Sequence, residues 1–317
     1  MFFLPQRASV LREVTGLKTL KILTQRNSKL FFKDKGMFFS SLITPVILLV
    51  LYASFLLSIY RDSISSAIPD AFGVSPSVID ALAAGQLASS LLAVCCVTIA
   101  FCSNLLMIQD KVTGAIGDLT VSPVKRSVLG LSYFLSSAFV TLVICLTATV
   151  ICFIYISTIG WYLSAKDVLL ILLDVILLTV FGVALSSCVN FFLSTQGQLS
   201  AVGTLVSVAY GFICGAYMPI ASFSEGLRSV LMYLPGSYAT SLLHNHWMNG
   251  AFAELSDSGV PAEITNGLRD GVDCNLYFAG DKVEISTMYA VLLGAIILAL
   301  AIYIAFNVFS AKHRNRR

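Results

Sequence analysis

The sequence has few charged residues, and this scarcity excludes an ordinary soluble protein. Only 12% of its 317 residues are Asp, Glu, Lys or Arg, whereas a soluble domain carries about 25%. Hydrophobic residues make up 57% of the chain, and its mean hydropathy is +0.87. Because so few charges cannot cover a folded surface in water, the chain is predicted to lie in a lipid bilayer.

Motifs for nucleotide binding and for catalysis are also missing. The sequence contains no GxxxxGK loop followed by Ser or Thr, no GxSxG and no HExxH. It has no CxxC pair and no Cys/His cluster with zinc spacing. Seven of its eight cysteines lie in apolar runs, where cysteine acts as a small hydrophobe. We therefore expect no catalytic residue, no metal or cofactor on this chain, no disulfide framework and no nucleic-acid partner.

Two segments contain residues of the kinds that bind metals. His244 and His246 form an HNH sequence beside Trp247, which we interpret as polar residues at the membrane surface in preference to a metal pair. The acidic stretch 249–285 has carboxylates that suit calcium but lacks the spacing of a calcium-binding loop. Neither segment is predicted to hold a metal.

Long apolar runs are the main feature that is present. A membrane-spanning helix needs about 20 mostly apolar residues. Six runs meet this length, at roughly 37–60, 81–108, 128–157, 167–193, 199–219 and 286–310. The sequence thus predicts an all-α polytopic membrane protein with six transmembrane helices.

The basic residues set the orientation of these spans. Fifteen of the 20 lysines and arginines lie before the first span, between the second and third, or after the sixth. Because lysine and arginine concentrate on the cytoplasmic side, both termini are predicted to be cytoplasmic. We expect the chain to lie in the cell membrane.

The chain divides into three parts on this topology. Residues 1–36 form a basic N-terminal segment whose helical part, 8–33, either lies on the inner membrane surface or is a plain topology-fixing tail. Residues 37–310 form the six-span domain, with a cytoplasmic loop at 109–127 and an external region at 220–285. Residues 311–317 form a basic cytoplasmic tail.

The external region begins with an apolar segment that many breaks interrupt. Gly and Pro punctuate residues 211–248 too often for a straight span. Non-helical backbone at membrane depth needs protein or a water-filled cavity to satisfy it. We therefore predict re-entrant amphipathic helices between spans five and six, with Tyr233, Tyr238 and Trp247 in an interfacial belt. The residues that mark this re-entrant region are Gly215, Pro219, Pro235 and Tyr238. Residues 249–285 are expected to form a small external lobe or a mobile loop.

Three polar residues interrupt the apolar spans. Asp174 lies about two turns into the fourth span, and an acid at such a place is a functional candidate by default. It faces a substrate path, pairs with a neighbour, or reaches headgroups at the outer boundary. Asn104 and Asn190 lie near the cytoplasmic ends of their spans, where hydrogen bonding between helices is the expected role.

The cytoplasmic loop carries a family resemblance. Residues 110–128 read DKVTGAIGDLTVSPVKRSV, and this resembles the first cytoplasmic loop of ABC-2 type export permeases. In that family an acidic residue, a glycine, a leucine and a Ser/Thr-Pro before a basic residue recur at this spacing. Two further features resemble the family. One is RNSKLFFKD at 26–34 before the first span, and the other is a fifth span that ends with Gly215–Pro219, followed by amphipathic helices with the Pro-aromatic motif Leu234–Tyr238.

The resemblance implies a two-part transport machine. Two permease subunits, identical or homologous, would pair around a path through the membrane lipid. A separate ABC ATPase subunit would hold ATP and Mg, and the loop 109–127 would form a coupling helix docked on it. That helix would begin near Asp110 or Lys111 and present Ile116 and Leu119 as apolar contacts, and Pro123 would end it. The implied coupling residues are Asp110, Lys111, Gly114, Ile116, Leu119, Pro123 and Arg126.

The implied function is export of a drug-like or amphipathic natural product, or of a peptide. Lipid-linked glycan or lipid export by the same family is the first alternative, and an ion-gradient-driven secondary transporter is the second. A membrane enzyme and a structural or sensor subunit fit the residues less well. The substrate-path candidates are small, polar or aromatic residues of the second, fourth and fifth spans: Thr98, Ser103, Asp174, Thr204, Ser207, Tyr210 and Phe212. Ordinary helix packing explains these residue types equally well.

Overall fold

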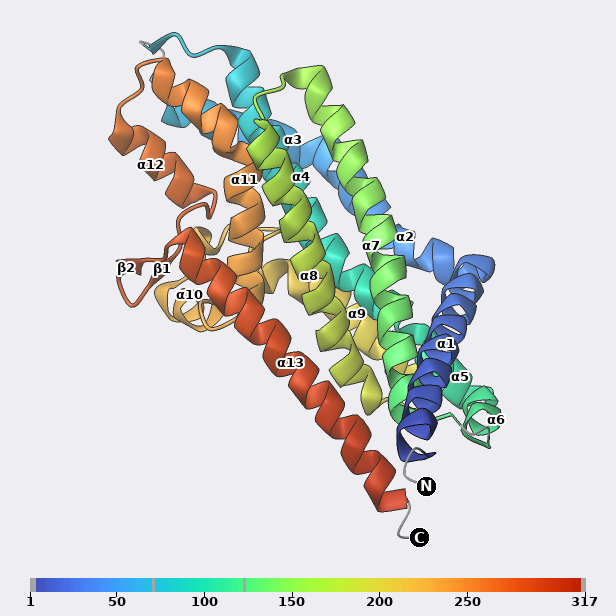
Figure 1. The fold of residues 1–317 in the computed structure, drawn as a ribbon. Helices are drawn as coiled ribbons and strands as arrows, with labels where there is room; N and C mark the ends of the chain where they lie inside the picture. The colour runs from blue at the N-terminus through green and yellow to red at the C-terminus, as the bar shows by residue number, and fades with distance from the viewer. Residues whose placement is uncertain (1–3, 70–71, 122–123, 315–317) are drawn as a thin grey trace.

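A computed structural model describes residues 4–69, 72–121 and 124–314 as a bundle of helices (Figure 1). In chain order the helices are α1 (Leu4–Lys33), α2 (Lys35–Leu51), the π-helical turn η1 (Tyr52–Leu56), α3 (Leu57–Ala67), α4 (Pro76–Ser103), α5 (Leu105–Val112), α6 (Ala115–Val121), α7 (Arg126–Ile159), α8 (Ala165–Phe191), α9 (Gln196–Ile213), the 3-10 turn η3 (Ile220–Ser222), α10 (Glu225–Leu231), α11 (Pro235–Asp257), α12 (Ala262–Gly271) and α13 (Ile285–Arg314). Two short antiparallel strands, β1 (Tyr277–Phe278) and β2 (Asp281–Lys282), form the sheet of the described residues.

Five stretches of the described residues are long and apolar enough to cross a membrane. They are Lys35–Ala67, Pro76–Val112, Arg126–Ile159, Ala165–Phe191 and Ile285–Asn307. They correspond to the first, second, third, fourth and sixth predicted spans. The predicted all-α polytopic membrane fold is thereby confirmed.

The predicted fifth span differs from the structure. Helix α9 replaces the predicted span 199–219 and ends at Ile213, and its apolar part, Ala201–Ile213, is shorter than the other five stretches. The chain reverses at Gly215, whose φ of +81° is a left-handed conformation that favours glycine. The apolar residues that follow Gly215 therefore belong to a turn, although their hydropathy resembles that of a span.

Side-chain caps fix where several helices begin. Ser164 and Asp167 cap α8 reciprocally: the Asp167 backbone N–H donates to Ser164 Oγ, and the Ser164 backbone N–H donates to Asp167 Oδ2. Thr195 and Gln198 form the same capping box at α9. Such boxes satisfy backbone donors that the first turn of a helix leaves unpaired.

Helix α4 occupies the centre of the bundle. Every residue from 81 to 101 is buried, and α2, α7, α8, α9 and α11 pack around it. A helix that is apolar on all sides belongs in such a position. At Gly182 of α8, an added Cβ would lie 2.9 Å from the Cys96 carbonyl oxygen, so the two helices approach backbone to backbone, as small residues permit in membrane bundles.

The segment between α9 and α13 is more ordered than the sequence suggests. After the short η3 and α10, helix α11 runs for 23 residues and packs against α4, α8 and α13. The prediction of short amphipathic helices over 211–248 is therefore wrong for residues beyond Pro235, because after the Pro235–Gly236 pair no proline or glycine breaks the chain until Gly250. The acidic stretch beyond α11 folds as a small lobe of α12 and the β1–β2 hairpin.

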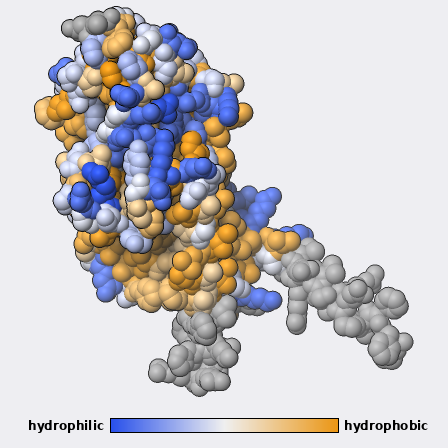
Figure 2. Space-filling view, turned by 90° about the vertical axis from the view of Figure 1, so that its left-hand side faces the viewer, coloured by the Kyte–Doolittle hydropathy of each residue, from blue (hydrophilic) through white to orange (hydrophobic). Residues whose placement is uncertain are grey.

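The polar lobe and the apolar bundle are separate on the surface. Figure 2 shows hydrophilic residues concentrated over the upper part of one face, with a mostly hydrophobic band beneath them. Figure 1 places α12 and the end of α11 in that upper part, at the far end of the bundle from both termini. The external position of this lobe and the cytoplasmic position of the termini stay predictions.

Helix α1 is a packed part of the bundle. It lies beside the first half of α7 (Figure 1), and the Ser28 and Ser136 hydroxyls share a hydrogen bond of 3.1 Å. Leu23 contributes to a small apolar cluster with residues of α5 and α7. Its predicted place on the inner membrane surface stays a prediction.

Candidate functional site

The loop that was predicted to be cytoplasmic contains two short helices, α5 and α6, joined by a sharp turn. Helix α5 ends at Val112, where the Thr113 backbone N–H and hydroxyl both donate to the Gln109 carbonyl at 2.9 Å. Gly114 follows with φ +84°, the left-handed conformation that commonly ends a helix. The new helix, α6, begins at Ala115, so it starts later than the predicted position near Asp110 or Lys111.

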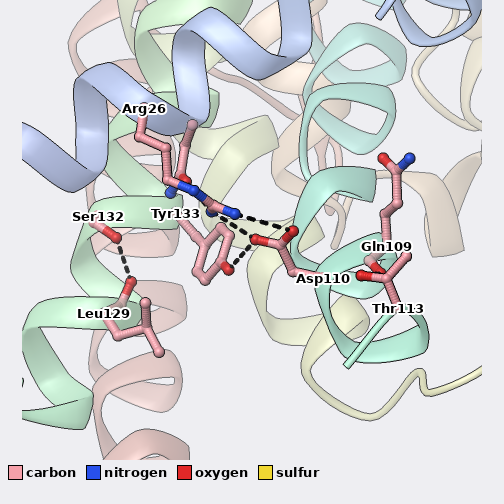
Figure 3. Close-up of polar contacts among 8 residues, drawn as sticks. Arg26, Gln109, Asp110, Thr113, Leu129, Ser132 and Tyr133 are labelled. Atoms are coloured by element: carbon pink, nitrogen blue, oxygen red, sulfur yellow. Dashed lines mark hydrogen bonds and ion pairs between the residues drawn. The ribbon is translucent and has the colours of Figure 1, made fainter. Parts of the chain in front are cut away.

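Asp110 is the anchor of this loop, and it points into the protein (Figure 3). Arg26 Nη1 of α1 donates to Asp110 Oδ2 at 2.8 Å, and the Tyr133 hydroxyl of α7 donates to the same oxygen at 2.5 Å. Three segments far apart in the sequence therefore meet at one carboxylate. This geometry joins the end of α5 to the helices on both sides of it.

The surroundings of Asp110 explain why it stays paired. Its side chain is 8% exposed and that of Arg26 is 32% exposed. The hydrogen bond with Asp110 raises the pKa of Arg26 above its ordinary value, so the guanidinium stays charged. A buried carboxylate that loses such a partner is strongly destabilising, which makes Arg26 and Tyr133 necessary to the position of the loop.

Lys111 also acts inside the protein. Its Nζ donates to the backbone carbonyls of Phe191 at 3.1 Å and Leu193 at 3.0 Å, and it lies 3.4 Å from that of Asn190. These carbonyls end helix α8, where a cation satisfies free acceptors and complements the helix dipole. The loop is thus fixed to α8 as well as to α1 and α7.

The apolar residues of α6 divide between inside and outside. Leu119, a predicted docking contact, packs half-buried against the cluster of Leu23, Leu106 and Tyr133. Ile116 is also half-buried, whereas Val121 is 89% exposed. Val121 was not among the predicted contacts.

The remaining predicted loop residues have distinct places. Gly114 forms the turn described above, and Arg126 is the first residue of α7. Pro123 lies outside the described residues.

The predicted substrate-path residues fall into two groups. The first group is interior: Ser103 contacts Thr141 at 3.0 Å between their hydroxyl oxygens, Thr98 donates to its own helix, and Tyr210 is buried. The second group lies on the outer face of α9, where Thr204 and Phe212 are exposed and Ser207 is half-buried. The role of both groups in a substrate path stays a prediction.

Asp174 pairs with neighbours, which was one of three expectations. It is 2% exposed, and His246 Nδ1 lies 2.5 Å from its Oδ2. The Tyr289 hydroxyl donates to its Oδ1 at 2.6 Å. His244 is also buried and lies 3.2 Å from the Ser90 hydroxyl.

The prediction of membrane-surface positions for both histidines is therefore wrong. The prediction of an interfacial position for Trp247 and Tyr238, which are 2% and 5% exposed, is wrong for the same reason: all four residues belong to the buried part of α11. Within the part of the chain that the structure describes, no group of three metal-binding side chains occurs.

The two predicted asparagines behave differently. Asn104 Nδ2 donates to Ser186 and Ser187 of α8, and its Oδ1 accepts from Ser137 of α7. This confirms the expected hydrogen bonding between helices. The Asn190 side chain is buried with no partner among the described residues, so the same expectation is wrong there.

The residues that mark the predicted re-entrant region build the turns around α10. An added Cβ at Gly215 would lie 2.9 Å from Asp273 Oδ2, and that carboxylate accepts from the backbone N–H groups of Ile220 and Ala221. Pro219 precedes η3, and Pro235 opens α11. Tyr238 is buried and donates to the Met232 carbonyl at 2.6 Å. Asp273, which no sequence pattern marks, holds this turn to the lobe.

Comparison with known proteins adds one finding. The family model described as ABC-2 type transporter matches residues 18–245, which is well over half of the chain. The match includes α5, α6 and every residue of the anchor around Asp110. No curated protein matches the sequence.

Proposed function

The chain belongs to the ABC-2 type transporter family, and from this premise we propose that it is the permease subunit of an ATP-driven exporter. Such a permease has no nucleotide site of its own, and the family implies association with an ABC ATPase subunit. In this proposal that subunit supplies ATP and Mg, and the cargo is a drug-like or amphipathic molecule or a peptide. A second permease subunit, identical or homologous, completes the path, and both termini face the cytoplasm.

The anchored loop is the observation that supports coupling to an ATPase. Helix α6 projects from a base that Asp110 ties to α1 and α7 and that Lys111 ties to α8. A force on α6 would therefore reach three helices together instead of bending a free loop. This is the property that an alternating-access permease needs where ATP-driven motion enters it.

The exposed end of α6 indicates where a partner would make contact. Val121, the last residue of α6, is 89% exposed, while Leu119 is turned toward the apolar cluster. An apolar side chain with so little cover in the free chain gains most from burial in a groove of another protein. We assign the docking contact to Val121 and leave Leu119 a role in holding α6 to the bundle.

The test is co-purification from the native membrane with the tagged full chain in mild detergent. We expect an ATPase with a phosphate-binding loop to co-purify, and Val121→Asp to remove it while Val121→Leu retains it. Leu227→Asp on α10 introduces the same charge at an exposed position on the opposite side of the molecule from α6 (Figure 1), and it should leave association unchanged.

Each other result has a definite meaning. Equal association of Val121→Asp and wild type would overturn the docking contact. A chain that never recovers an ATPase would overturn the exporter and favour transport driven by an ion gradient, with Asp174 as the first residue to study. A lipid-linked glycan or a lipid is the alternative cargo. Transport assays with the intact complex distinguish it from a drug-like molecule or a peptide.

A further inference from the structure

A cavity of about 670 Å³ lies between α3, the turn that follows α9, and α12. Tyr60 and Ile64 line it from α3, Met218 and Pro219 from the turn, and Leu268 from α12. It belongs to the polar-lobe end of the molecule, and none of the predicted substrate-path residues lines it. Its volume falls within the range of small-molecule sites, about 300–1,000 Å³.

The chemistry of the cavity wall is uniform. None of its lining residues is acidic, basic or histidine, and most are aliphatic. The polar side chains of the wall are the hydroxyls of Tyr60, Ser63, Tyr217 and Ser222. The Tyr217 hydroxyl donates to the Ser207 carbonyl. A ligand charge would find no counter-ion here and would lose its hydration, so the wall selects neutral molecules.

Independent contacts hold the walls in place. The Tyr52 hydroxyl of the π-helical turn donates to the Ala216 carbonyl at 3.2 Å, which fixes the turn to the first span. Asp273 accepts from the backbone N–H groups of Ile220 and Ala221 on the other side. The turn wall is thus held by hydrogen bonds on two sides, to Tyr52 of the first span and to Asp273 beyond α12. The cavity is therefore a preformed feature of the fold.

Glycine keeps the α12 side of the cavity open. An added Cβ at Gly267 or Gly271 would meet nothing within 4 Å, although both residues line the cavity. Larger residues at these positions would fill the space that a ligand would use.

From these features we infer that the cavity binds a neutral amphiphile, with its apolar body against Ile64 and Leu268 and its hydroxyl or ester group toward Ser63 and Ser222. This inference rests on the proposed function, since it gives the exporter a holding site at the end where cargo would leave. The bound class includes monoacylglycerols and uncharged drug-like molecules, and excludes carboxylates and amines.

The test uses a photoactivatable monoacylglycerol with the full chain in phosphatidylcholine nanodiscs, followed by mass-spectrometric mapping of the labelled peptides. Matched fatty-acid and alkylamine probes carry the same chain with opposite charges. We expect the neutral probe to label residues 56–67 and 264–272 in preference to the lipid-facing surface of α2. Labelling by the charged probes should be about tenfold lower, which corresponds to ~1.4 kcal/mol of binding.

Two cavity-filling variants and one control complete the design. Gly267→Trp fills the cavity from α12, and Ser63→Trp fills it from α3. Loss of labelling in both variants would show that the probe binds in the cavity between these two helices. Gly226→Trp on α10 also projects into open space but lies outside the cavity. We expect both fillings to abolish labelling of these peptides and the control to retain it, with thermal unfolding confirming that each variant is folded.

Three results would overturn the inference. They are equal labelling by charged and neutral probes, unchanged labelling in both filled variants, and labelling confined to the lipid-facing surface. ATPase co-purification is measured on the same samples, so the exporter and the cavity are tested separately. A labelled cavity without an ATPase would overturn the exporter alone, and an ATPase without labelling would overturn the cavity alone.

Discussion

His246 of α11 and Asp174 of α8 meet at 2.5 Å in the buried interior of the bundle. The Tyr289 hydroxyl of α13 donates a hydrogen bond to the other oxygen of the same carboxylate, so three helices meet at one acid. Helix α11 connects directly to the polar lobe, and this cluster is therefore the place where the lobe is fixed to two of the predicted spans.

We predict that Asp174→Asn destabilises the folded chain by about 1–3 kcal/mol, because an amide has one acceptor oxygen where the carboxylate places one oxygen against His246 and the other against Tyr289, so one buried polar contact is lost. Tyr289→Phe should cost about 1 kcal/mol, the value of one hydrogen bond. Thermal unfolding of the purified chain in detergent measures both. Asp257→Asn, at an exposed acid at the end of α11, is the control. An equal loss of stability in this control would contradict the role of the Asp174 cluster.

The anchor around Asp110 gives a second prediction. Asp110→Asn leaves Arg26 without its charged acceptor, so we expect a loss of about 3 kcal/mol in stability. The exposed Asp118 of α6 lies eight residues away, and Asp118→Asn should change stability by less than about 0.5 kcal/mol. Protease sensitivity of the 109–127 loop provides a local readout. A loop that remains equally protected in Asp110→Asn would show that Lys111 and Tyr133 suffice to hold it.

The sequence predicted those parts of the fold that depend on apolar length. Five of six spans follow from runs of about 20 apolar residues, whereas the turn at Gly114 delays the start of the loop helix, which was expected to begin near Asp110 or Lys111. The burial of α11 could not be read in the same way, because its HNH sequence is polar and its neighbours α4, α8 and α13 come from distant parts of the chain. A polar residue appears interfacial in a sequence until the partner that satisfies it, such as Asp174 for His246, is known.

The same limitation applies to the site. The loop itself was found from its charges and breaks, but Asp110 and Lys111 were expected to face a partner. Their contacts, Arg26 and the end of α8, are about 80 residues away in the chain, and no spacing rule predicts such pairs. Val121 had no sequence signal, since exposure of an apolar residue depends on which face of α6 the cluster around Leu119 covers.

Asp273 makes the stability of the polar lobe depend on pH. Burial raises the pKa of Asp273 to about 7, against the backbone N–H groups of Ile220 and Ala221 and the charge of Arg228, which lower it. Between an unfolded value of 3.8 and this value, the folded protein holds a proton that the unfolded chain has released. The resulting stability is present at low pH and is lost as pH rises through 7.

We therefore expect the turn at 215–222 to exchange amide hydrogen faster at pH 8 than at pH 5.5, after correction for intrinsic exchange, by an amount equivalent to roughly 2 kcal/mol. Asp273→Asn should remove the pH dependence, whereas Asp281→Asn, at an exposed residue of β2, should retain it. Exchange that is slower at pH 8 would mean that the two backbone donors outweigh burial.

The contact between α4 and α8 gives the last prediction. A Cβ at Gly182 would lie 2.9 Å from the Cys96 carbonyl oxygen and 3.1 Å from Val97 Cα, and neither backbone atom can move without shifting α4. Gly182→Ala is thus expected to destabilise the bundle by about 1–3 kcal/mol through overpacking. Gly294 of α13 has nothing within 4 Å of an added Cβ, so Gly294→Ala should be neutral or stabilise the chain by up to about 1 kcal/mol through helix propensity. Thermal unfolding of the two variants separates the effects, because the same chemical change acts in opposite directions at the two sites. If both variants unfold at the wild-type temperature, α4 and α8 are less closely packed than their contact at Gly182 indicates.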